Sequence, residues 1–438
     1  MPRHVHPQVG ALGRHDGELR GRRRGVRDES GEQVGRHGAP WADGVRRGRA
    51  RRLGIGTRGR RRQRPGGASS LGAAGSPSRT SAPPPGWQTD PVRDLARLPK
   101  AHLHLHFTGS MRPETLAEMA AERRVRLPDA LLEADPLRFR SDERGWFRFQ
   151  RLYDAARACV RTEADMRRIV AEAAEDDARE GSGRLELQVD PTSYAPFVGG
   201  ITPAVEIVMD EARAASARTG VDVGLVVAAS RMRHPLEART LARLAARHAG
   251  DGPGEVVGFG LSNDERRGDT SAFAPAFAIA RRAGLASVPH GGELLGPAHV
   301  EDVLEHLHPD RLGHGVRSAE DPRVLERVVD EGVALEVCPA SNVSLGVFAQ
   351  AQDVPLRTLV DAGAAVALGA DDPLLFRSRL VAQYEAARAL GFDDAGLADL
   401  ARASVRASRA SDAVKARLLT GIDGWLAAEP ADAAARRA

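Results

Sequence analysis

The sequence predicts an α/β protein built as a (β/α)8 TIM-type barrel, and three observations support that fold class. Short apolar segments recur between residues 98 and 370, and segments with a helical spacing of apolar side chains separate them. Such alternation is typical of a parallel sheet, and eight repeats of it close a barrel. An open doubly wound sheet is the alternative, but the glycine-rich fingerprint expected after its first strand is missing.

The predicted elements alternate along the chain. The expected strands cover residues 98–106, 185–189, 221–228, 256–261, 286–290, 311–314, 333–337 and 365–370. The expected helices cover residues 113–124, 146–158, 163–180, 203–219, 235–248, 271–283, 297–306, 321–331 and 355–362. The first two helices exceed what one βα unit needs, so we expect extra helices inserted in the first βα connection. Ser110 is the expected cap of the first helix.

Composition divides the 438-residue chain into three parts. Residues 1–90 are rich in Arg, Gly and Pro, and we expect a disordered extension there, because such a segment buries too little apolar surface to offset its ordering entropy. Residues 91–425 are expected to form the barrel, and residues 426–438 an alanine-rich tail. The basic excess lies in residues 1–65, so we expect no nucleic-acid partner for the folded domain.

Cysteine usage and hydropathy indicate a cytoplasmic location. Only Cys159 and Cys338 are present, which excludes a disulfide framework and suits a reducing compartment. No apolar run has the length of a transmembrane helix, and the N-terminal residues lack the hydrophobic segment of a signal peptide. We therefore expect no membrane partner.

Histidine and acidic side chains stand where the predicted strands end. His104 and His106 end the first strand, His290 ends the fifth, and Asp371 follows the eighth. The carboxyl ends of parallel strands meet at one barrel mouth, so these residues are expected to converge. Three imidazoles and one carboxylate suit a divalent ion such as Zn²⁺, which lowers the pKa of a bound water to roughly 7. The sequence therefore predicts one zinc ion per subunit.

Three other polar residues lie near the same mouth. Glu293 follows His290 on one loop, where a carboxyl can carry protons, while His314 and Asp372 are not needed as metal ligands. The alternatives are a charge at the start of the next helix for Glu293, a core-facing ring for His314 and a helix cap for Asp372.

Three more residues are expected in supporting positions. Alternation places His102 on the same strand face as His104, one step deeper, which favours a supporting or core role. Glu336 is expected to hold a metal ligand or His314. Cys338 has no CxxC partner, so a buried structural thiol is favoured over a nucleophile or ligand.

These residues resemble the adenosine deaminase family of metal-dependent amidohydrolases. The matching stretches keep the family's order and cover about residues 95–415. They are residues 98–109, 113–115, 185–187, 290–293, 311–315, 336–342 and 371–373. The resemblance implies a barrel with one zinc ion held by His104, His106, His290 and Asp371.

The resemblance also implies hydrolytic deamination of adenosine or 2′-deoxyadenosine to inosine or its deoxy form, with release of ammonia. A zinc-bound hydroxide would attack C6 of the purine, and Glu293 would protonate N1. His314 would steady or deprotonate the metal-bound water, and Asp372 would form a hydrogen bond at N7. A small purine nucleoside is thus the implied partner.

The substrate pocket departs from the family pattern. The family's Leu-Asp-Gly is Phe107-Thr108-Gly109 here, and the family's Asp at this position contacts ribose. The glycine that gives the purine a backbone contact is replaced by Asn263. We therefore assign Thr108, Gly109, Asn263 and Asp372 to substrate binding and keep adenine or a 5′-modified adenosine as alternative substrates.

Two alternatives of other classes remain. The barrel is also used for metal-dependent hydrolysis of amides and phosphoesters, but those relatives often need a bridging lysine, and only Lys100 lies near a predicted strand end. A barrel kept only for binding, or an arginine-rich nucleic-acid binder, is the non-enzymatic alternative, and it predicts missing ligands or a salt-dependent affinity for DNA.

Overall fold

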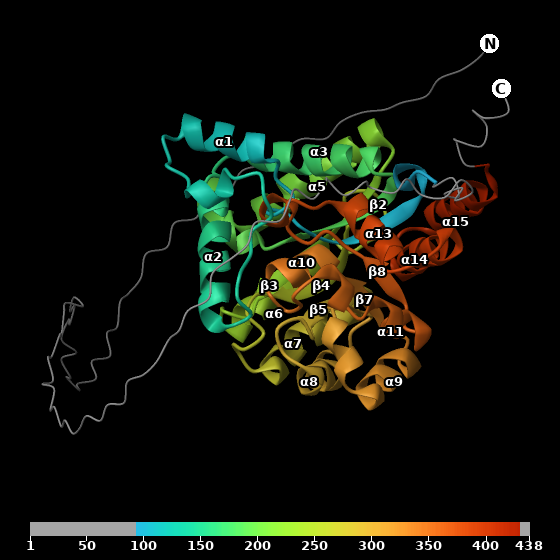
Figure 1. Ribbon diagram of the computed structural model, residues 1–438. Coiled ribbons are helices and arrows are strands. Elements are labelled where there is room, and N and C mark those ends of the chain that lie inside the picture. Colours follow the sequence, from blue (N-terminus) through green and yellow to red (C-terminus); the bar gives the residue numbers. More distant parts are fainter. Residues whose placement is uncertain (1–92, 430–438) are drawn as a thin grey trace, which may run out of the picture. The chain divides into compact units, whose positions relative to one another are not determined.

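The computed structural model describes residues 93–429, and these residues form the predicted barrel (Figure 1). Its parallel strands are hydrogen-bonded in sequence order, and a bridge between Leu105 and Asp371 joins the first strand to the segment after the last. The strands are β1 (Lys100–His106), β2 (Ser182–Val189), β3 (Asp222–Ser230), β4 (Val256–Ser262), β5 (Ala286–Gly291), β6 (Arg311–His314), β7 (Ala334–Val337) and β8 (Val366–Leu368). The predicted extension, residues 1–90, and most of the predicted tail lie outside the described residues.

Helices surround the strands and confirm the alternating order. Those between strands are α3 (Glu163–Arg179), α4 (Ala195–Val198), α5 (Ile201–Thr219), α6 (Pro235–Arg247), α7 (Thr270–Arg282), α8 (Pro297–Leu307), α9 (Pro322–Asp330), α10 (Pro339–Ser344) and α11 (Leu356–Asp361). Short 3₁₀ turns are η1 (Leu95–Arg97), η2 (Asp129–Leu131), η3 (Pro191–Ser193), η4 (Val316–Glu320) and η5 (Ala351–Asp353). Within residues 93–429, none of the helices combines the length and apolar character that crossing a bilayer requires.

The expected insertion in the first βα connection is present. Helices α1 (Pro113–Glu122) and α2 (Glu143–Arg157) precede α3 between β1 and β2. The expected cap at Ser110 was wrong: Arg112 is the cap position of α1, and the Ser110 hydroxyl donates to the carbonyl oxygen of Phe107. The hydroxyl therefore stabilises the turn after β1 instead of the helix.

Helices after β8 complete the barrel and were not predicted. They are α12 (Pro373–Phe376), α13 (Leu380–Ala389), α14 (Asp394–Ala407) and α15 (Asp412–Ala427). Helix α14 packs on β8 and β1, where the barrel closes. The Arg93 guanidinium donates hydrogen bonds to Asp394 and to the carbonyl oxygen of Trp425. These bonds hold the start of the described chain against its last two helices. Helix α15 continues to Ala427, past the boundary expected at residue 425.

Strand β1 is irregular in the middle, which changes the expected place of one histidine. Its pairing register with β2 shifts between His102 and Leu105. His102 consequently bonds Asp177 of the outer helix α3 through Nδ1, at 2.9 Å, and accepts from the amide of Ala370 at Nε2. The prediction that His102 shares a face with His104 was wrong, but its supporting role is confirmed because it joins α3 to the segment after β8.

The inside of the barrel below the mouth holds a buried ion network. The Arg311 guanidinium bonds Glu186 at 2.5 Å and Glu336 at 2.6 Å, and Glu186 also pairs with Arg184 at 3.1 Å. These side chains are almost fully buried. Burial alone would raise the pKa of Glu186, but the charges of Arg311 and Arg184 outweigh burial and lower that pKa to about 2.

This network predicts a loss of stability in acid. The pKa of Glu186 is lower in the folded chain than its ordinary value of 4.5, so its contribution is complete above about pH 4.5 and is lost as the pH falls toward 2. Between pH 5 and pH 3 the free energy of unfolding should fall by about 2 kcal/mol more in the wild type than in Glu186→Gln. Urea unfolding across this range measures the difference. Equal slopes for the two proteins would contradict the assignment.

Candidate metal and catalytic site

The predicted metal-binding residues converge at the carboxyl ends of the strands. His106 Nε2 lies 3.2 Å from Asp371 Oδ1, and His104 Nε2 lies 3.6 Å from the same oxygen. The rings of His104 and His290 are 4.8 Å apart between centroids. His314 belongs to the same cluster, with its ring centroid 4.7 Å from that of His104. Four strands therefore bring these residues to one point, as the sequence predicted.

The donor atoms of this cluster suit a metal ion. One potential ligand atom each from His104, His106 and His290 lies within 4.8 Å of the others. Nε2 of His104 and Nε2 of His290 are buried and have no hydrogen-bond partner among the described residues. Buried nitrogens without partners cost free energy, and a divalent cation bound between them would remove that cost. The residues present therefore fit the ion that the sequence predicts.

Two glycines allow the close packing. A Cβ atom at Gly313 would lie 2.5 Å from Cδ2 of His290 and 3.0 Å from Cε1 of His104. A Cβ atom at Gly109 would lie 1.8 Å from Oδ1 of Asp372. Only glycine fits at either position without moving a site residue. Gly109, predicted to bind substrate, therefore also leaves the space that the Asp372 carboxyl occupies.

Neighbouring charged groups orient the histidines. Glu336 Oε2 lies 2.8 Å from Nδ1 of His104, which directs Nε2 toward the cluster and confirms the expected role of Glu336. Burial lowers the pKa of His104, but the nearby Asp371 carboxylate and the hydrogen bond to Glu336 outweigh burial and raise that pKa to about 10. Arg231 at the end of β3 donates to the carbonyl oxygen of His290 at 2.7 Å. Arg231 was not predicted, because nothing in the sequence marks this contact.

Glu293 is held in place by another carboxylate. Glu265 accepts hydrogen bonds from the amides of Glu293, Leu294 and Leu295 at 3.1, 2.8 and 2.8 Å, which fixes the loop after β5. Burial and the neighbouring Asp371 charge raise the pKa of the Glu293 carboxyl well above its ordinary value. Glu265 was missed as a positioning residue, although an acidic residue just after a predicted strand was the available signal.

The other polar groups of the site are also perturbed. His314 Nε2 lies 3.5 Å from Glu293 Oε1, and burial together with the His104 charge lowers the pKa of His314 to about 3. Burial and the Asp371 charge raise the pKa of Asp372 well above its ordinary value. The site therefore combines a neutral imidazole with two carboxyls that retain protons readily, which suits proton transfer to a substrate.

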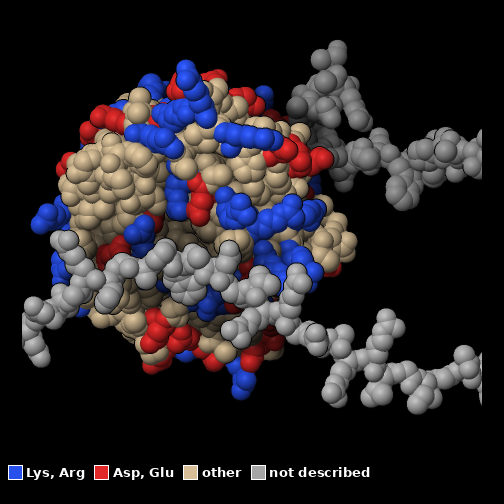
Figure 2. All heavy atoms as spheres, turned by 90° about the vertical axis from the view of Figure 1, so that its left-hand side faces the viewer, with Lys and Arg blue, Asp and Glu red and all other residues tan. Residues whose placement is uncertain are grey.

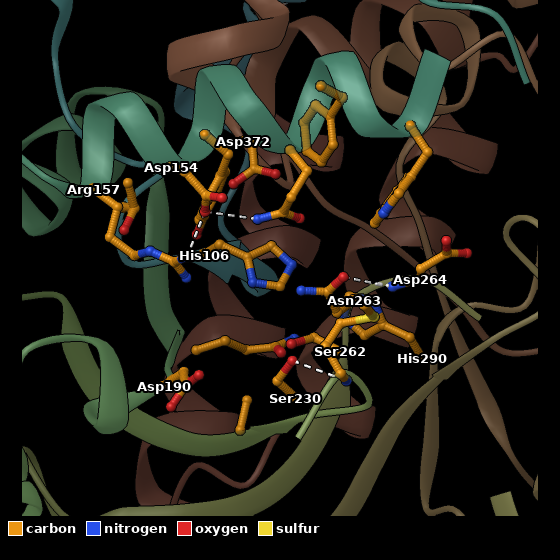
Figure 3. Close-up of a pocket in the computed structure, with 18 of the residues that line it drawn as sticks. His106, Asp154, Arg157, Asp190, Ser230, Ser262, Asn263, Asp264, His290 and Asp372 are labelled. Carbon is orange, nitrogen blue, oxygen red and sulfur yellow. Dashed lines mark hydrogen bonds and ion pairs between the residues drawn. The ribbon is translucent and has the colours of Figure 1, made fainter. Parts of the chain in front are cut away.

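A cavity of about 540 Å³ opens above the cluster and is lined by His106, His290, Glu293, His314 and Asp372, among others. Figure 3 shows His106, Asp372, Asn263 and His290 around this cavity, with Asp154 and Arg157 of α2 beside it. Cys338, by contrast, is buried and absent from the lining. Its thiol donates to the carbonyl oxygen of Glu336 at 3.5 Å, and this buried position agrees with the expected structural role.

The backbone is strained at several of these positions. Asn263, His314 and Asp371 have φ angles of +82°, +65° and +61°. Positive φ is costly for residues other than glycine, and asparagine is among those that tolerate it best. Asn263 therefore occupies a backbone conformation that glycine adopts most readily. Strain at three residues of one mouth is typical of a functional site.

Comparison with known proteins identifies the family. Residues 99–425 match the family model described as adenosine deaminase. The chain belongs to the adenosine deaminase family. A Streptomyces virginiae protein with the provisional name adenosine/adenine deaminase is 64% identical over 337 residues, which are 76% of this chain and 98% of the relative. Adenine deaminase of Sinorhizobium fredii is 34% identical over 330 residues, 75% of this chain and 99% of the relative.

A solved structure agrees with these relatives. The crystal structure of adenine deaminase from Arthrobacter aurescens matches with a TM-score of 0.69 and 31% identity, over 75% of this chain and 99% of that one. The chain is therefore a hydrolytic deaminase with the amidohydrolase barrel. Membership of the family leaves the choice between adenosine and adenine open.

Proposed function

We propose that this protein is a zinc-dependent deaminase that converts free adenine and water into hypoxanthine and ammonia. His104, His106, His290 and Asp371 would hold the ion, which supplies a Lewis acid that activates water for attack on C6. The predicted preference for adenosine and the adenine alternative share this chemistry. The choice of adenine depends on the residue at position 108.

The environment of the Thr108 hydroxyl is the main support for adenine as the substrate. It lies 2.5 Å from the hydroxyl oxygen of Tyr194, and both residues are almost fully buried. Burial raises the pKa of Tyr194, so this pair stays neutral. The family resemblance implies that members acting on adenosine carry an aspartate at this position, and that its carboxylate contacts the sugar. A small hydroxyl already bonded to Tyr194 offers ribose no such acceptor, and this favours the free base.

The remaining site residues would donate a proton to the purine, bind it and orient the attacking water. Glu293 is buried and retains a proton that it can deliver to N1, which makes C6 more electrophilic. Asp372 has an Oδ1 atom without a partner among the described residues, and this atom is available to N7. His314 lies within 3.5 Å of Glu293 and is placed to orient the attacking water. Each role is one that the resemblance implies for that position.

The charges around the cavity favour a neutral substrate. Three arginines line it, and each has a carboxylate partner: Arg157 pairs with Asp154, Arg233 with Glu237, and Arg267 with Glu143 and Asp264. A phosphate group is bound best by arginines that are free to form paired hydrogen bonds. On the face shown in Figure 2, acidic and basic side chains are interspersed. We therefore expect nucleoside phosphates to be poorer substrates than the neutral base.

A substrate panel tests the proposal. Zinc-loaded protein is incubated with adenine, adenosine, 2′-deoxyadenosine and a 5′-modified adenosine, and ammonia release gives kcat/KM for each. We expect the highest value for adenine, at least tenfold above adenosine, because the sugar gains no carboxylate contact.

The outcomes separate the alternatives. A higher kcat/KM for adenosine would reject the role given to Thr108 and restore the preference expected from the family resemblance. No ammonia from any aminopurine, with zinc bound, would reject deamination itself and favour hydrolysis of another class of substrate.

A further inference from the structure

One buried glutamine at the site has no hydrogen-bond partner among residues 93–429. Gln188 lies at the carboxyl end of β2, in register with His106 of β1, and it lines the cavity. Its side chain is 1% exposed. Both Oε1 and Nε2 lack a hydrogen-bond partner among the described residues. Alternation along β2 places Gln188 on the same inward face as Glu186, so its amide points into the barrel mouth.

Gln188 differs in this respect from comparable groups. Gln383 is equally buried, but its amide bonds the backbone of Ala340 and Arg379 and the hydroxyl of Ser378. Across the cavity wall, Ser230 and Asn263 each accept a hydrogen bond from a backbone amide. A buried amide without partners destabilises the fold, and a leucine of similar size would avoid this cost. An amide kept at such a position indicates a ligand.

The position of Gln188 relative to the metal-binding cluster defines what the amide faces. The cluster is formed by residues of β1, β5 and β6 and of the segment after β8, and Gln188 on β2 stands beside it, paired in register with His106 of β1. A purine bound with C6 at the cluster would therefore place its 6-amino group within reach of β2. Addition of water to the planar C6 moves the departing amine out of the ring plane.

We propose that Gln188 binds the departing amine of the 6-aminopurine, through a hydrogen bond from the amine to Oε1. This inference rests on the proposed function. In the overall reaction the C6–O bond forms and the C6–N bond breaks. One proton of water ends on N1 and the other on the amine, which leaves as ammonia. The bond to Oε1 forms as the nitrogen leaves the ring plane, so it acts in the transition state and contributes to kcat more than to KM.

The test compares two leaving groups in Gln188→Leu. Adenine releases an amine with N–H donors, whereas 6-chloropurine undergoes the same substitution at C6 and releases chloride, which has none. We expect kcat/KM for adenine to fall at least tenfold, mainly through kcat, and that for 6-chloropurine to change less than threefold. Equal losses on both substrates, or no loss on adenine, would overturn the inference.

Stability supplies a second readout. Because the Gln188 amide has no partner among the described residues, Gln188→Leu should have a Tm equal to or above that of the wild type. The matched control is Gln383→Leu, which removes three hydrogen bonds of a residue outside the cavity lining and should lower Tm while both substrates keep their relative rates. A lower Tm for Gln188→Leu would show that the amide serves the fold and would overturn the inference.

The design also separates this inference from the proposed function. Gln188→Met, with an unbranched apolar side chain, repeats the comparison if leucine disturbs folding. A wild type that acts on neither adenine nor 6-chloropurine would reject the proposed function. A wild type active on both, with equal losses in the variants, would reject the role of Gln188 alone.

Discussion

Glu293→Gln is expected to lower kcat on adenine by about 10² to 10⁴, the usual contribution of a general acid–base group. Glutamine keeps the shape of the side chain but has no acidic proton to give to N1. Because Glu265 holds the loop through backbone amides, the substitution should leave the loop and its neighbours in place. Zinc content is expected to match that of the wild type, since His104, His106, His290 and Asp371 are unchanged.

The measurement is steady-state ammonia release together with metal analysis of the same preparation. The control is Glu305→Gln on α8, where the exposed carboxylate pairs with the half-buried Arg327 at 3.6 Å, and this variant should keep the wild-type kcat. A kcat for Glu293→Gln within threefold of the wild type would remove Glu293 from the mechanism.

Alternation of apolar segments was sufficient to predict the barrel. Strands such as β3 carry a dense run of buried apolar residues, here Val223, Leu225 and Val227, and such runs are visible without a structure. Alternation of strands and helices predicts a helix only where a strand follows it. It therefore gave no helices after β8, where α13, α14 and α15 pack on the closed barrel instead of leading to another strand.

The site was predictable where strand ends alone determine it. His104, His106, His290 and Asp371 converge because a barrel brings all strand ends to one mouth. Groups that act through tertiary contacts were not predictable. The positioning role of Glu265 depends on the contact between its loop and the loop after β5. The orientation of His102 depends on a register shift in β1 that the residues of the strand do not indicate. Gln188 was overlooked because one polar residue in an apolar strand is usually a surface position.

His290→Ala is expected to abolish zinc retention and, with it, deamination. The variant removes one imidazole from the predicted ligand set and leaves His104, His106 and Asp371, of which Asp371 already interacts with both histidines. Each protein ligand contributes strongly to the affinity of a zinc site, so an incomplete set should lose the ion during dialysis. The barrel should remain folded, because the deleted ring has no hydrogen-bond partner at Nε2 among residues 93–429.

Metal analysis after dialysis against a weak chelator measures the effect, and circular dichroism checks the fold. The matched control is His306→Ala, which deletes a surface imidazole on α8 that pairs with Asp302 at 3.4 Å, and it should retain one zinc ion per chain. Full zinc occupancy in His290→Ala would show that the ion is held by other residues of the cluster. His314 would then be the first alternative ligand, because its ring centroid lies 5.2 Å from that of His290 and its Nε2 lies 4.0 Å from Asp371. A folded protein that loses zinc and activity together would instead tie the chemistry to the four residues that the strand ends bring together.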